Sequence, residues 1–344
     1  MEYRVPTMAE VGAVPWNGLT VASTFSGCGG SSLGYRMAGY RVLWASEFVD
    51  AARASYVASA SGAAVVDGRG LRLVTAEDVF AATGMAKGEL DLLDGSPPCA
   101  SFSLSGNRAK DWGKAKRYSD TTQRTDDLFL EFARLLRGLQ PRCFVAENVA
   151  GLVTGVAKGH FLEILAALKG CGYRVECRVV DAQWLGVPQA RRRTIFVGVR
   201  NDIDRAPSFP TPSSSRFTIA DALRSVTGPV EPETAIARFA IGREYDRMRP
   251  GSSSDKYFNL VRPRADRPCP TICATAGSPG AAGIVHHTEK RKFTIQELKA
   301  ICSFPADFVL TGTYAQQWER LGRAVPPVMM AAIAAKLRDD VLCQ

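Results

Sequence analysis

The chain has 344 residues, of which 46% are apolar and 22% are charged, and this balance excludes a disordered or fibrous protein. It carries 43 Lys and Arg residues against 34 Asp and Glu, a net charge of +9, which favours a partner with phosphate groups without excluding an ordinary basic protein. No apolar run approaches the roughly 20 residues of a membrane-spanning helix, so we expect no membrane partner. Nine cysteines stand singly beside three histidines, which predicts no metal site and a reducing compartment such as the cytoplasm.

The first 200 residues alternate between short apolar runs and amphipathic stretches. We expect strands at 19–25, 41–45, 90–94, 143–146, 173–180 and 194–199, and helices at 31–39, 126–139 and 161–169. This alternation predicts a parallel, doubly wound α/β sheet with helices on both faces. Sheets of this kind bind ligands at the carboxyl ends of their strands.

The amino-acid composition changes near Arg200. Residues 201–290 are rich in Pro, Gly and Ser and contain only short strand-like runs, which predicts an inserted, loop-rich second domain. Residues 200–292 hold 15 basic and 10 acidic residues, over half of the chain's charge excess. Helical periodicity returns at 294–301 and 328–337, so we expect residues 1–200 and the returning segment 291–344 to form one domain around the insert.

A glycine-rich turn follows the first expected strand. Phe25 to Gly30 reads FSGCGG and opens a helix, so its glycines allow a ligand to approach the backbone and the helix offers free amides. Glu47 ends the next strand, where a carboxylate can accept hydrogen bonds from both ribose hydroxyls of a nucleoside. An ordinary strand–helix turn beside a surface Glu would look the same, and without a Walker lysine the pattern does not imply phosphate binding.

Three further groups end or begin strands at the same predicted edge. Cys99 follows two prolines at the end of a strand and is a candidate nucleophile, although no activating histidine lies nearby. Glu147 ends the strand 143–146, and Arg191 and Arg193 precede the strand 194–199. Guanidinium groups there stabilise developing negative charge or bind phosphate. A buried structural cysteine, a helix-capping acid and a solvated basic turn are the alternative interpretations.

The ordered set of motifs resembles the S-adenosylmethionine-dependent DNA (cytosine-5) methyltransferase family of bacteria and phages. The motifs are FSGCGG at 25–30, Glu47, Asp78-Val79, GSPPCASFS at 95–103, ENV at 147–149, QARRR at 189–193, RKFTIQELKAICSFP at 291–305 and GRAVPP at 322–327. Each is modest alone, but their order covers nearly the whole chain outside the insert. The resemblance implies a Rossmann-like methyltransferase sheet and a smaller, mainly β target-recognition domain at 201–290.

The resemblance implies that S-adenosylmethionine binds at the first motifs. Glu47 would bind the ribose, and Asp78, which lies 21 residues before Cys99, would bind the adenine amino group. The other cosubstrate-binding residues that it implies are Phe25, Gly27, Cys28, Gly29, Gly30, Phe48, Val79, Pro98, Arg323, Ala324 and Val325.

The resemblance also implies a covalent mechanism. Cys99 would add to carbon-6 of a cytosine, which makes carbon-5 nucleophilic, and Glu147 would hold ring nitrogen-3 in a protonated state. Arg191 and Arg193 would support the cleft, with Arg193 close to the adduct. A base inside a duplex cannot reach such a site, so the cytosine must flip out of the helix.

Double-stranded DNA is the partner that the resemblance implies. The stretch 100–125 is strongly basic and contains glycines, which predicts a mobile loop that closes over DNA and carries Cys99 at its base. The expected DNA-binding residues are Ser103, Arg108, Lys110, Lys114, Lys116, Arg117 and Gln189. We expect a monomer in the cytoplasm of a bacterium or an infected host. The sequence reveals neither the recognition site nor a restriction endonuclease partner.

One position departs from the family pattern. The last motif normally has Asn after its Gly, whereas this chain has Arg323. A cation about 5 Å from a sulfonium costs roughly 3 kcal/mol at an effective dielectric of about 20, so Arg323 should turn away or meet an anion. Carboxy-S-adenosylmethionine would supply one through a bidentate arginine–carboxylate pair, and the product would then be carboxymethylcytosine. A tolerated substitution is the alternative.

Two further functions remain open. A tRNA cytosine-5 methyltransferase of the same family is disfavoured by the sizeable insert and by the absence of that branch's Cys-Phe-Thr signature. A catalytically inactive DNA-binding regulator is disfavoured because Cys99, Glu147, Arg191 and Arg193 are all present.

Overall fold

A computed structural model describes residues 2–59, 65–98, 116–118, 121–123, 127–153 and 158–343, with only the backbone at 116–118, 121–123 and 158. Its centre is a seven-stranded sheet in the order β3-β2-β1-β4-β7-β10-β8. The strands are β1 (Thr20–Thr24), β2 (Arg41–Ser46), β3 (Val65–Asp67), β4 (Leu92–Gly95), β7 (Cys143–Val149), β8 (Tyr173–Asp181) and β10 (Arg192–Arg200). The predicted α/β sheet is therefore confirmed.

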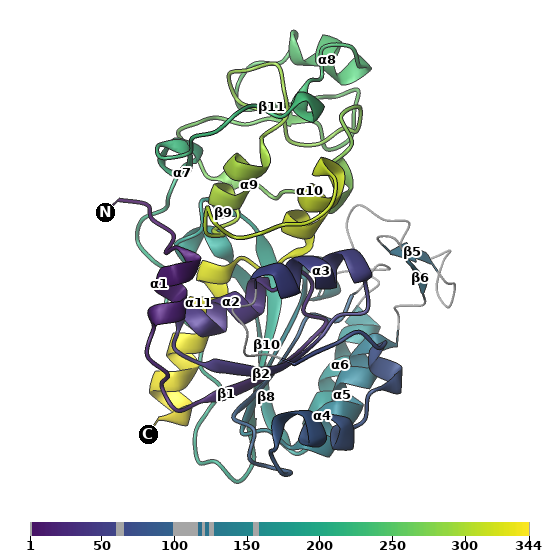
Figure 1. The fold of residues 1–344 in the computed structure, drawn as a ribbon, viewed down its shortest axis with the longest axis vertical. Helices are drawn as coiled ribbons and strands as arrows, with labels where there is room; N and C mark the ends of the chain where they lie inside the picture. The colour runs from purple at the N-terminus through teal and green to yellow at the C-terminus, as the bar shows by residue number, and fades with distance from the viewer. Residues whose placement is uncertain are drawn as a thin grey trace.

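Helices cover both faces of this sheet (Figure 1). On one face, α2 (Gly30–Met37) and α11 (Pro327–Leu337) share a core with Val21, Val145 and Val197. On the other face lie α4 (Ala76–Thr83), α5 (Leu128–Leu139) and α6 (Lys158–Lys169), whose core includes Phe132 and Phe196. The outer helix α1 (Met8–Ala13) lies beside α2, and α3 (Asp50–Ser59) follows β2.

One strand direction differs from the sequence expectation. β1, β2, β3, β4 and β7 are parallel, but β10 runs antiparallel to both β7 and β8. The connection from β8 to β10 spans residues 182–191 and contains only a 3₁₀ turn (Ala182–Trp184) and β9 (Gln189–Ala190). It is too short for the helical crossover that a parallel strand needs. The turn returns the chain directly, and Arg191 and Arg193 arrive beside the end of β7.

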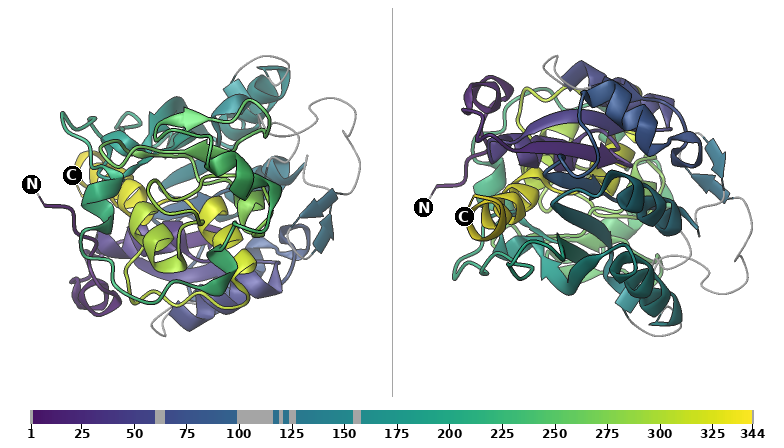
Figure 2. Two further views of the ribbon diagram at one scale, coloured as in Figure 1. Left: turned by 90° about the horizontal axis from the view of Figure 1, so that it is seen from above. Right: turned by 90° about the horizontal axis from the view of Figure 1, so that it is seen from below.

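A second lobe stands above the carboxyl edge of the sheet (Figures 1 and 2). It contains α7 (Ile219–Leu223), α8 (Ala240–Tyr245) and the two-residue strands β11 (Ser252–Ser253), β12 (Val261–Arg262) and β13 (Cys269–Pro270). Residues 201–290 are all described, and none of their strands exceeds two residues, so the expected mainly β character is not found. The frequent prolines and glycines there interrupt any longer ladder.

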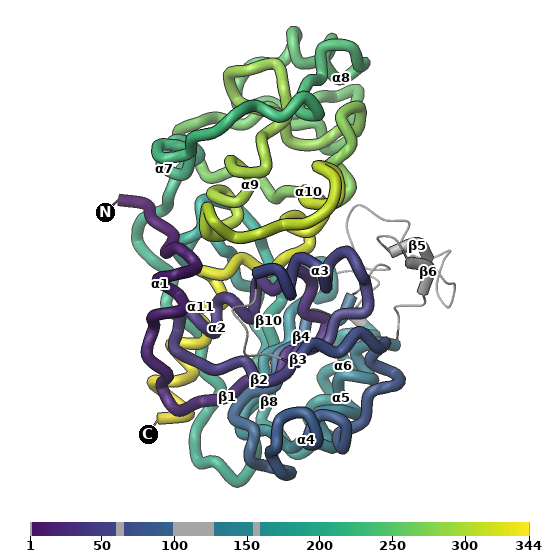
Figure 3. The backbone as a smooth tube through the Cα atoms, viewed as in Figure 1, coloured from purple at the N-terminus to yellow at the C-terminus, as the bar shows by residue number. Residues whose placement is uncertain are grey.

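The expected boundary at residue 290 does not divide the two lobes. Figure 3 shows α9 (Ile295–Ile301) and α10 (Tyr314–Arg323) in the upper lobe, and only α11 continues down to the sheet. One core joins Ile272, Phe293 and Trp318 of the upper lobe to Cys28 and Leu33 beside the sheet. The last 54 residues therefore connect the lobes rather than simply returning to the first. Among the described residues, no helix is long and apolar enough to cross a membrane.

Candidate active site

A cavity of about 740 Å³ opens between the carboxyl edge of the sheet and the upper lobe. Its walls come from the turn after β1, the ends of β2, β4 and β7, and the start of β10. The upper lobe contributes residues 271–275, 320 and 322–325. The cavity thus lies where doubly wound sheets bind ligands, as the sequence predicted.

The glycine-rich turn forms one end of this cavity. Phe25 and Gly27 have left-handed backbone angles, with φ of 52° and 57°, so the chain reverses directly after β1. The carboxylate of Glu47 accepts from the backbone N–H of Gly27 through Oε2 and from that of Val49 through Oε1, each at 2.7 Å. Burial raises the pKa of Glu47, and these two hydrogen bonds oppose the rise. Each oxygen keeps a second lone pair for a hydroxyl donor.

The same turn touches the segment of the last motif. A methyl group on Gly30 would lie 2.2 Å from the carbonyl oxygen of Val325, so only glycine permits this approach. Ala324 and Val325, two of the expected cosubstrate-binding residues, therefore line the cavity directly beside the turn. Cys28 also lines it, but its side chain is buried, and burial raises the pKa of the thiol to about 12.

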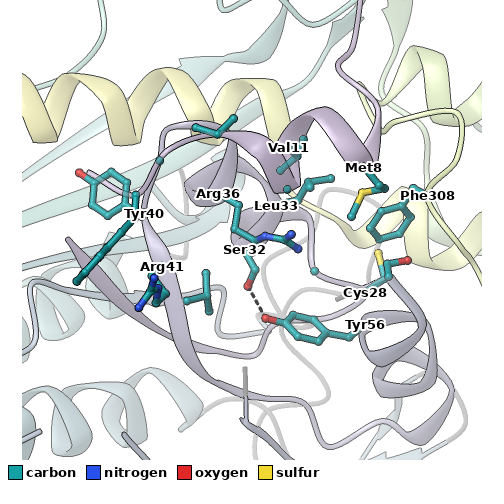
Figure 4. A pocket seen from close by; sticks show the side chains of 17 residues that line it. Met8, Val11, Cys28, Ser32, Leu33, Arg36, Tyr40, Arg41, Tyr56 and Phe308 are labelled. Atoms are coloured by element: carbon teal, nitrogen blue, oxygen red, sulfur yellow. Dashed lines mark hydrogen bonds between the residues drawn. The ribbon is translucent and has the colours of Figure 1, made fainter. Parts of the chain in front are cut away.

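Gly29 faces a second hollow behind the turn instead. This space of about 280 Å³ lies between α1, α2 and α3 (Figure 4). A methyl group on Gly29 would meet the Tyr56 ring at 3.0 Å, and the Tyr56 hydroxyl donates to Ser32 Oγ at 2.9 Å. Gly29 thus allows α3 to approach the turn and does not line the larger cavity.

The cavity wall near the exposed ring of Phe48 differs from the sequence prediction, which placed Asp78 and Val79 at the cosubstrate. Asp78 and Val79 do not line the cavity: Asp78 accepts from the Thr75 N–H at 2.8 Å as the cap of α4, and Val79 is buried in the core. Gly70 and Leu71 line the cavity there instead. The helix cap, Thr-x-x-Asp, is a sequence signal that accounts for Asp78 without a ligand.

Glu147 and Arg193 form an ion pair at the opposite end of the cavity. Arg193 Nε lies 2.7 Å from Glu147 Oε1, and the two side chains are only 13% and 10% exposed. Their strands are antiparallel neighbours, with Ile195 opposite Glu147 and Arg193 opposite Val149. The predicted convergence of these two residues is therefore found.

Arg191 lines the cavity although it is only 1% exposed. Its Nη1 donates to the Gly322 carbonyl at 3.0 Å, and its Nη2 donates to the Arg323 carbonyl at 3.3 Å. These carbonyls end α10, where backbone acceptors lack partners within the helix. Burial and the neighbouring Arg193 lower the pKa of Arg191 to about 9.

Arg323 lines the cavity with a side chain that is 32% exposed. Its Nε lies 2.8 Å from Glu319 Oε1, one helical turn earlier in α10. The anion expected for this arginine is thus present within its own helix.

Most of the predicted loop after β4 lies outside the part of the chain that the structure describes. Cys99, Ser103, Arg108, Lys110 and Lys114 lie outside the described residues, as do the side chains of Lys116 and Arg117 in β5 (Lys116–Tyr118), which pairs with β6 (Thr121–Gln123). Pro98, the residue before Cys99, lines the cavity, and the Pro97 carbonyl accepts from Asn148 Nδ2 at 3.0 Å.

Gln189, an expected DNA contact, lies away from the surface of the described structure. It is fully buried, and its Nε2 lies 3.2 Å from Cys302 Sγ. β9 pairs in parallel with β13, so the upper lobe covers this residue. Sequence reasoning missed the cavity residues Asn259, Thr271 to Thr275 and Arg320, because they come from loops and a helix that no strand-end pattern identifies.

A doubly wound sheet with a glycine turn, a buried carboxylate after the next strand and an acid–arginine pair at the same edge defines an α/β enzyme with a nucleoside-bearing cosubstrate. The chain belongs to the C-5 cytosine-specific DNA methylase family, whose model matches residues 19–339. It is therefore a DNA cytosine-5 methyltransferase, and the family implies S-adenosylmethionine as its cosubstrate.

Similar sequences and solved structures also include DNA methyltransferases. The chain is 30% identical to the Type II methyltransferase M1.HphI of Haemophilus parahaemolyticus, over 92% of this chain and 86% of that protein. It is 28% identical to M.NgoPII of Neisseria gonorrhoeae, over 95% and 97%. A prophage-encoded E. coli protein described as a DNA modification methyltransferase shares the fold at a TM-score of 0.75 and 21% identity, with 94% and 99% covered.

Proposed function

We propose that this enzyme transfers a methyl group from S-adenosylmethionine to carbon-5 of a cytosine flipped out of duplex DNA, through a transient bond to Cys99. The observation that carries the proposal is the shared cavity: the Gly27–Glu47 end and the Glu147–Arg193 end face one space. A donor and an acceptor base held at the two ends would meet between them.

The residues at the first end fit a nucleoside-bearing donor. The Glu47 carboxylate keeps lone pairs for ribose hydroxyls, and the exposed ring of Phe48 offers a face to an adenine. Because Asp78 caps α4, the backbone at Gly70 and Leu71 is the group near Phe48 that would contact the base edge. When bound, the sulfonium donor supplies an electrophilic methyl group.

The residues at the second end fit an activated cytosine. The Cys99 thiolate adds to carbon-6 while Glu147 delivers a proton to ring nitrogen-3, which removes the charge that addition would create. Carbon-5 then takes the methyl group, which leaves S-adenosylhomocysteine, and gives its own proton to a base such as water. The carbon–sulfur bond breaks to release the Cys99 thiolate as ring nitrogen-3 returns its proton to Glu147. Arg193 orients the Glu147 carboxyl through their 2.7 Å contact.

Duplex DNA is the substrate that charge and relatives favour. The net charge of +9 suits a phosphate backbone, and the relatives bear the name Type II methyltransferase, which supports a role beside a restriction endonuclease in a bacterial cytoplasm. We propose that the enzyme acts as a monomer and that its upper lobe reads the recognition site. The residues proposed to contact the DNA backbone are Ser103, Arg108, Lys110, Lys114, Lys116 and Arg117.

Labelled methyl transfer tests this proposal. We expect transfer to duplex DNA and none to tRNA, and Cys99→Ser should abolish transfer while DNA binding remains. Transfer to tRNA alone, or full activity of Cys99→Ser, would overturn it. A protein that binds DNA but transfers nothing in the wild type would be a regulator rather than an enzyme.

A donor with a carboxylate on its transferable carbon is a second candidate, and the observation that favours it is Arg323 in the cavity wall. The pair with Glu319 already neutralises much of that charge, which favours the plain methyl donor. Competition between S-adenosylmethionine and carboxy-S-adenosylmethionine, with the product mass read on digested DNA, decides between them. Carboxymethylcytosine from the wild type and its loss in Arg323→Asn would establish the second candidate; methylcytosine from both proteins would eliminate it.

A further inference from the structure

Phe258 is an aromatic residue of the upper lobe for which neither the core nor the proposed chemistry has a use. Of the residues that the structure describes, it is the most exposed large apolar one, at 74%. It lies between β11 and β12, and the next residue, Asn259, lines the cavity that holds the Glu147–Arg193 pair. Because Asn259 is itself exposed, it belongs to the rim of the cavity, and Phe258 stands next to this rim.

A tight turn presents Phe258 at this place. The N–H of Leu260 donates to the Tyr257 carbonyl at 3.1 Å, and Asn259 has a left-handed φ of 66°. These are the features of a type II turn, in which Asn is one of the few residues that tolerate the third position. Phe258 takes the second position, at the tip of the turn.

Both ends of this turn are anchored in the core of the upper lobe. Leu260 is fully buried in a cluster with Tyr245, and Tyr257 packs against the same cluster. Ser254 Oγ accepts from the Tyr257 N–H at 3.1 Å and donates to Glu244 Oε1 at 2.8 Å. The Ser254 N–H donates to the Leu260 carbonyl at 2.9 Å. The exposed ring is therefore carried on a well-anchored support.

A single apolar side chain among polar neighbours fits a nucleic acid better than a protein surface. Lys256 and Asn259 beside Phe258 are polar and exposed, and among the described residues 201–290 only Val230 is another exposed large apolar residue. A protein-binding surface presents a continuous apolar patch, whereas one aromatic ring suffices to stack on a base. The family to which the chain belongs acts on DNA.

Extrusion of a cytosine into the cavity leaves a gap in the duplex at the cavity mouth. The gap has the thickness of one base, and the loss of stacking around it costs free energy. Proteins that distort DNA insert apolar side chains between bases at such places. A phenyl ring is flat like a base, so it stacks on the bases above and below the gap in place of the missing one.

We propose that Phe258 is a wedge that enters the duplex as the target cytosine leaves it and stacks in the space that the cytosine vacates. It stabilises the opened duplex and does not touch the reacting atoms, so it is a positioning residue. The inference rests on the proposed extrusion of a cytosine into the cavity, and it names the residue that occupies the gap.

Single-turnover methyl transfer by the full chain tests the inference, once the recognition sequence is read from the modified sites in the DNA of an expressing bacterium. One duplex pairs the target cytosine with guanine, and a second duplex has an abasic position opposite it. On the paired duplex, Phe258→Ala should transfer about tenfold or more slowly than the wild type, because base stacking on the ring is lost. On the abasic duplex, this difference should shrink to within about threefold, because the cytosine has no pair to break.

A fluorescent base supplies a second readout. The fluorescence of 2-aminopurine at the target position rises when the base leaves the stack, so the wild type should raise it and Phe258→Ala should raise it much less. Phe258→Trp keeps a flat ring and should keep a rate within about threefold of the wild type. Val230→Ala is the matched control, because it removes another exposed apolar side chain and should keep the wild-type rate on both duplexes.

Two results would overturn the inference. One is a wild-type rate for Phe258→Ala on the paired duplex, as expected of a ring that belongs to a protein-binding surface. The other is an equal loss on the paired and abasic duplexes, as expected of a residue that only holds the enzyme on DNA. A wild type that transfers no methyl group to either duplex would instead contradict the proposed function, so the two failures are distinguishable.

Discussion

The pair of Glu147 and Arg193 combines two requirements in one contact. In the proposed mechanism Glu147 gives a proton to the base, and the Arg193 guanidinium 2.7 Å away fixes the direction in which its carboxyl group points. A base that enters the cavity brings its ring nitrogen as a competing acceptor for the proton. The pair therefore presents an oriented carboxyl group to a base that enters the cavity.

Replacement of Glu147 by Gln tests this role, because Gln keeps the shape but cannot transfer a proton. We expect the single-turnover rate of methyl transfer to fall by about 10²–10⁴-fold, with DNA affinity changed by less than about threefold. Glu163→Gln, on the exposed side of α6, is the control and should retain the wild-type rate. A rate within a factor of a few of the wild type for Glu147→Gln would show that this carboxyl group is not the acid.

Single residues show where sequence reasoning succeeds and where it fails. Glu47, Glu147 and Arg193 were predictable because a side chain at a strand end must appear at the edge of the sheet. Asp78 was misassigned because spacing alone does not separate a ligand from a helix cap, and the Thr75–Asp78 bonds identify the cap. Gln189 was misassigned because its burial depends on a partner strand, β13, that is 80 residues away in the sequence.

At the scale of elements, the end of α10 is held by Arg191 and forms the wall beside the glycine turn. Its carbonyls at Gly322 and Arg323 accept from the guanidinium, and Val325 then contacts Gly30. Arg191 therefore connects the strand that carries Arg193 to the segment next to the proposed donor site.

Arg191→Met should loosen this wall, because Met fills similar volume without the two hydrogen bonds. We expect S-adenosylhomocysteine to bind about tenfold or more weakly, since the Gly322 and Arg323 carbonyls both lose their charged donor. Affinity is measured by calorimetry, with Arg178→Met on the exposed edge strand β8 as the control. An unchanged affinity would contradict this prediction and would show that Arg191 contributes only to folding stability or to binding of the base.

The strands and helices themselves were predicted more accurately than their arrangement. The runs 143–146 and 194–199 are strands as expected, because both are short, apolar runs and the second consists mostly of β-branched and aromatic residues. Their antiparallel pairing follows from the shortness of the 182–191 connection, a feature that the strand pattern does not encode. Likewise, α9 was expected as a helix and α10 was not, and the side of the molecule on which both lie depends on the core with Ile272 and Trp318.

At the scale of the whole molecule, the stability of the two lobes should respond to pH in opposite ways. In the upper lobe, His286 is buried and its Nδ1 accepts from the Glu289 N–H at 3.1 Å, which requires an unprotonated nitrogen. Burial lowers the pKa of His286 to about 4, and Arg291 adds to this effect. Near the sheet, burial raises the pKa of Asp94 to about 7.

These shifts predict the sign of each contribution. A lowered histidine pKa gives stability that is present above pH 6.5 and is lost as the pH falls toward 4, by up to about 2–3 kcal/mol. A raised aspartate pKa gives stability that is present below about pH 4 and is lost as the pH rises through 7. Urea unfolding at pH 7 and pH 5 should show that His286→Asn loses less free energy of unfolding than the wild type on acidification. His160→Gln, on α6, is the control, and equal losses in the wild type and His286→Asn would contradict the prediction.

The two lobes leave one cavity between them, and the central claim is that a cytosine is bonded there to Cys99 while a donor waits at the other end. Trapping on duplex DNA that contains 5-fluorocytosine tests this claim most directly, because fluorine at carbon-5 prevents the release of the cysteine. With S-adenosylmethionine present, we expect an adduct that survives denaturation and whose modified peptide contains Cys99, and no adduct with Cys99→Ser. An adduct at another cysteine, or turnover of cytosine with no adduct from 5-fluorocytosine, would contradict the account.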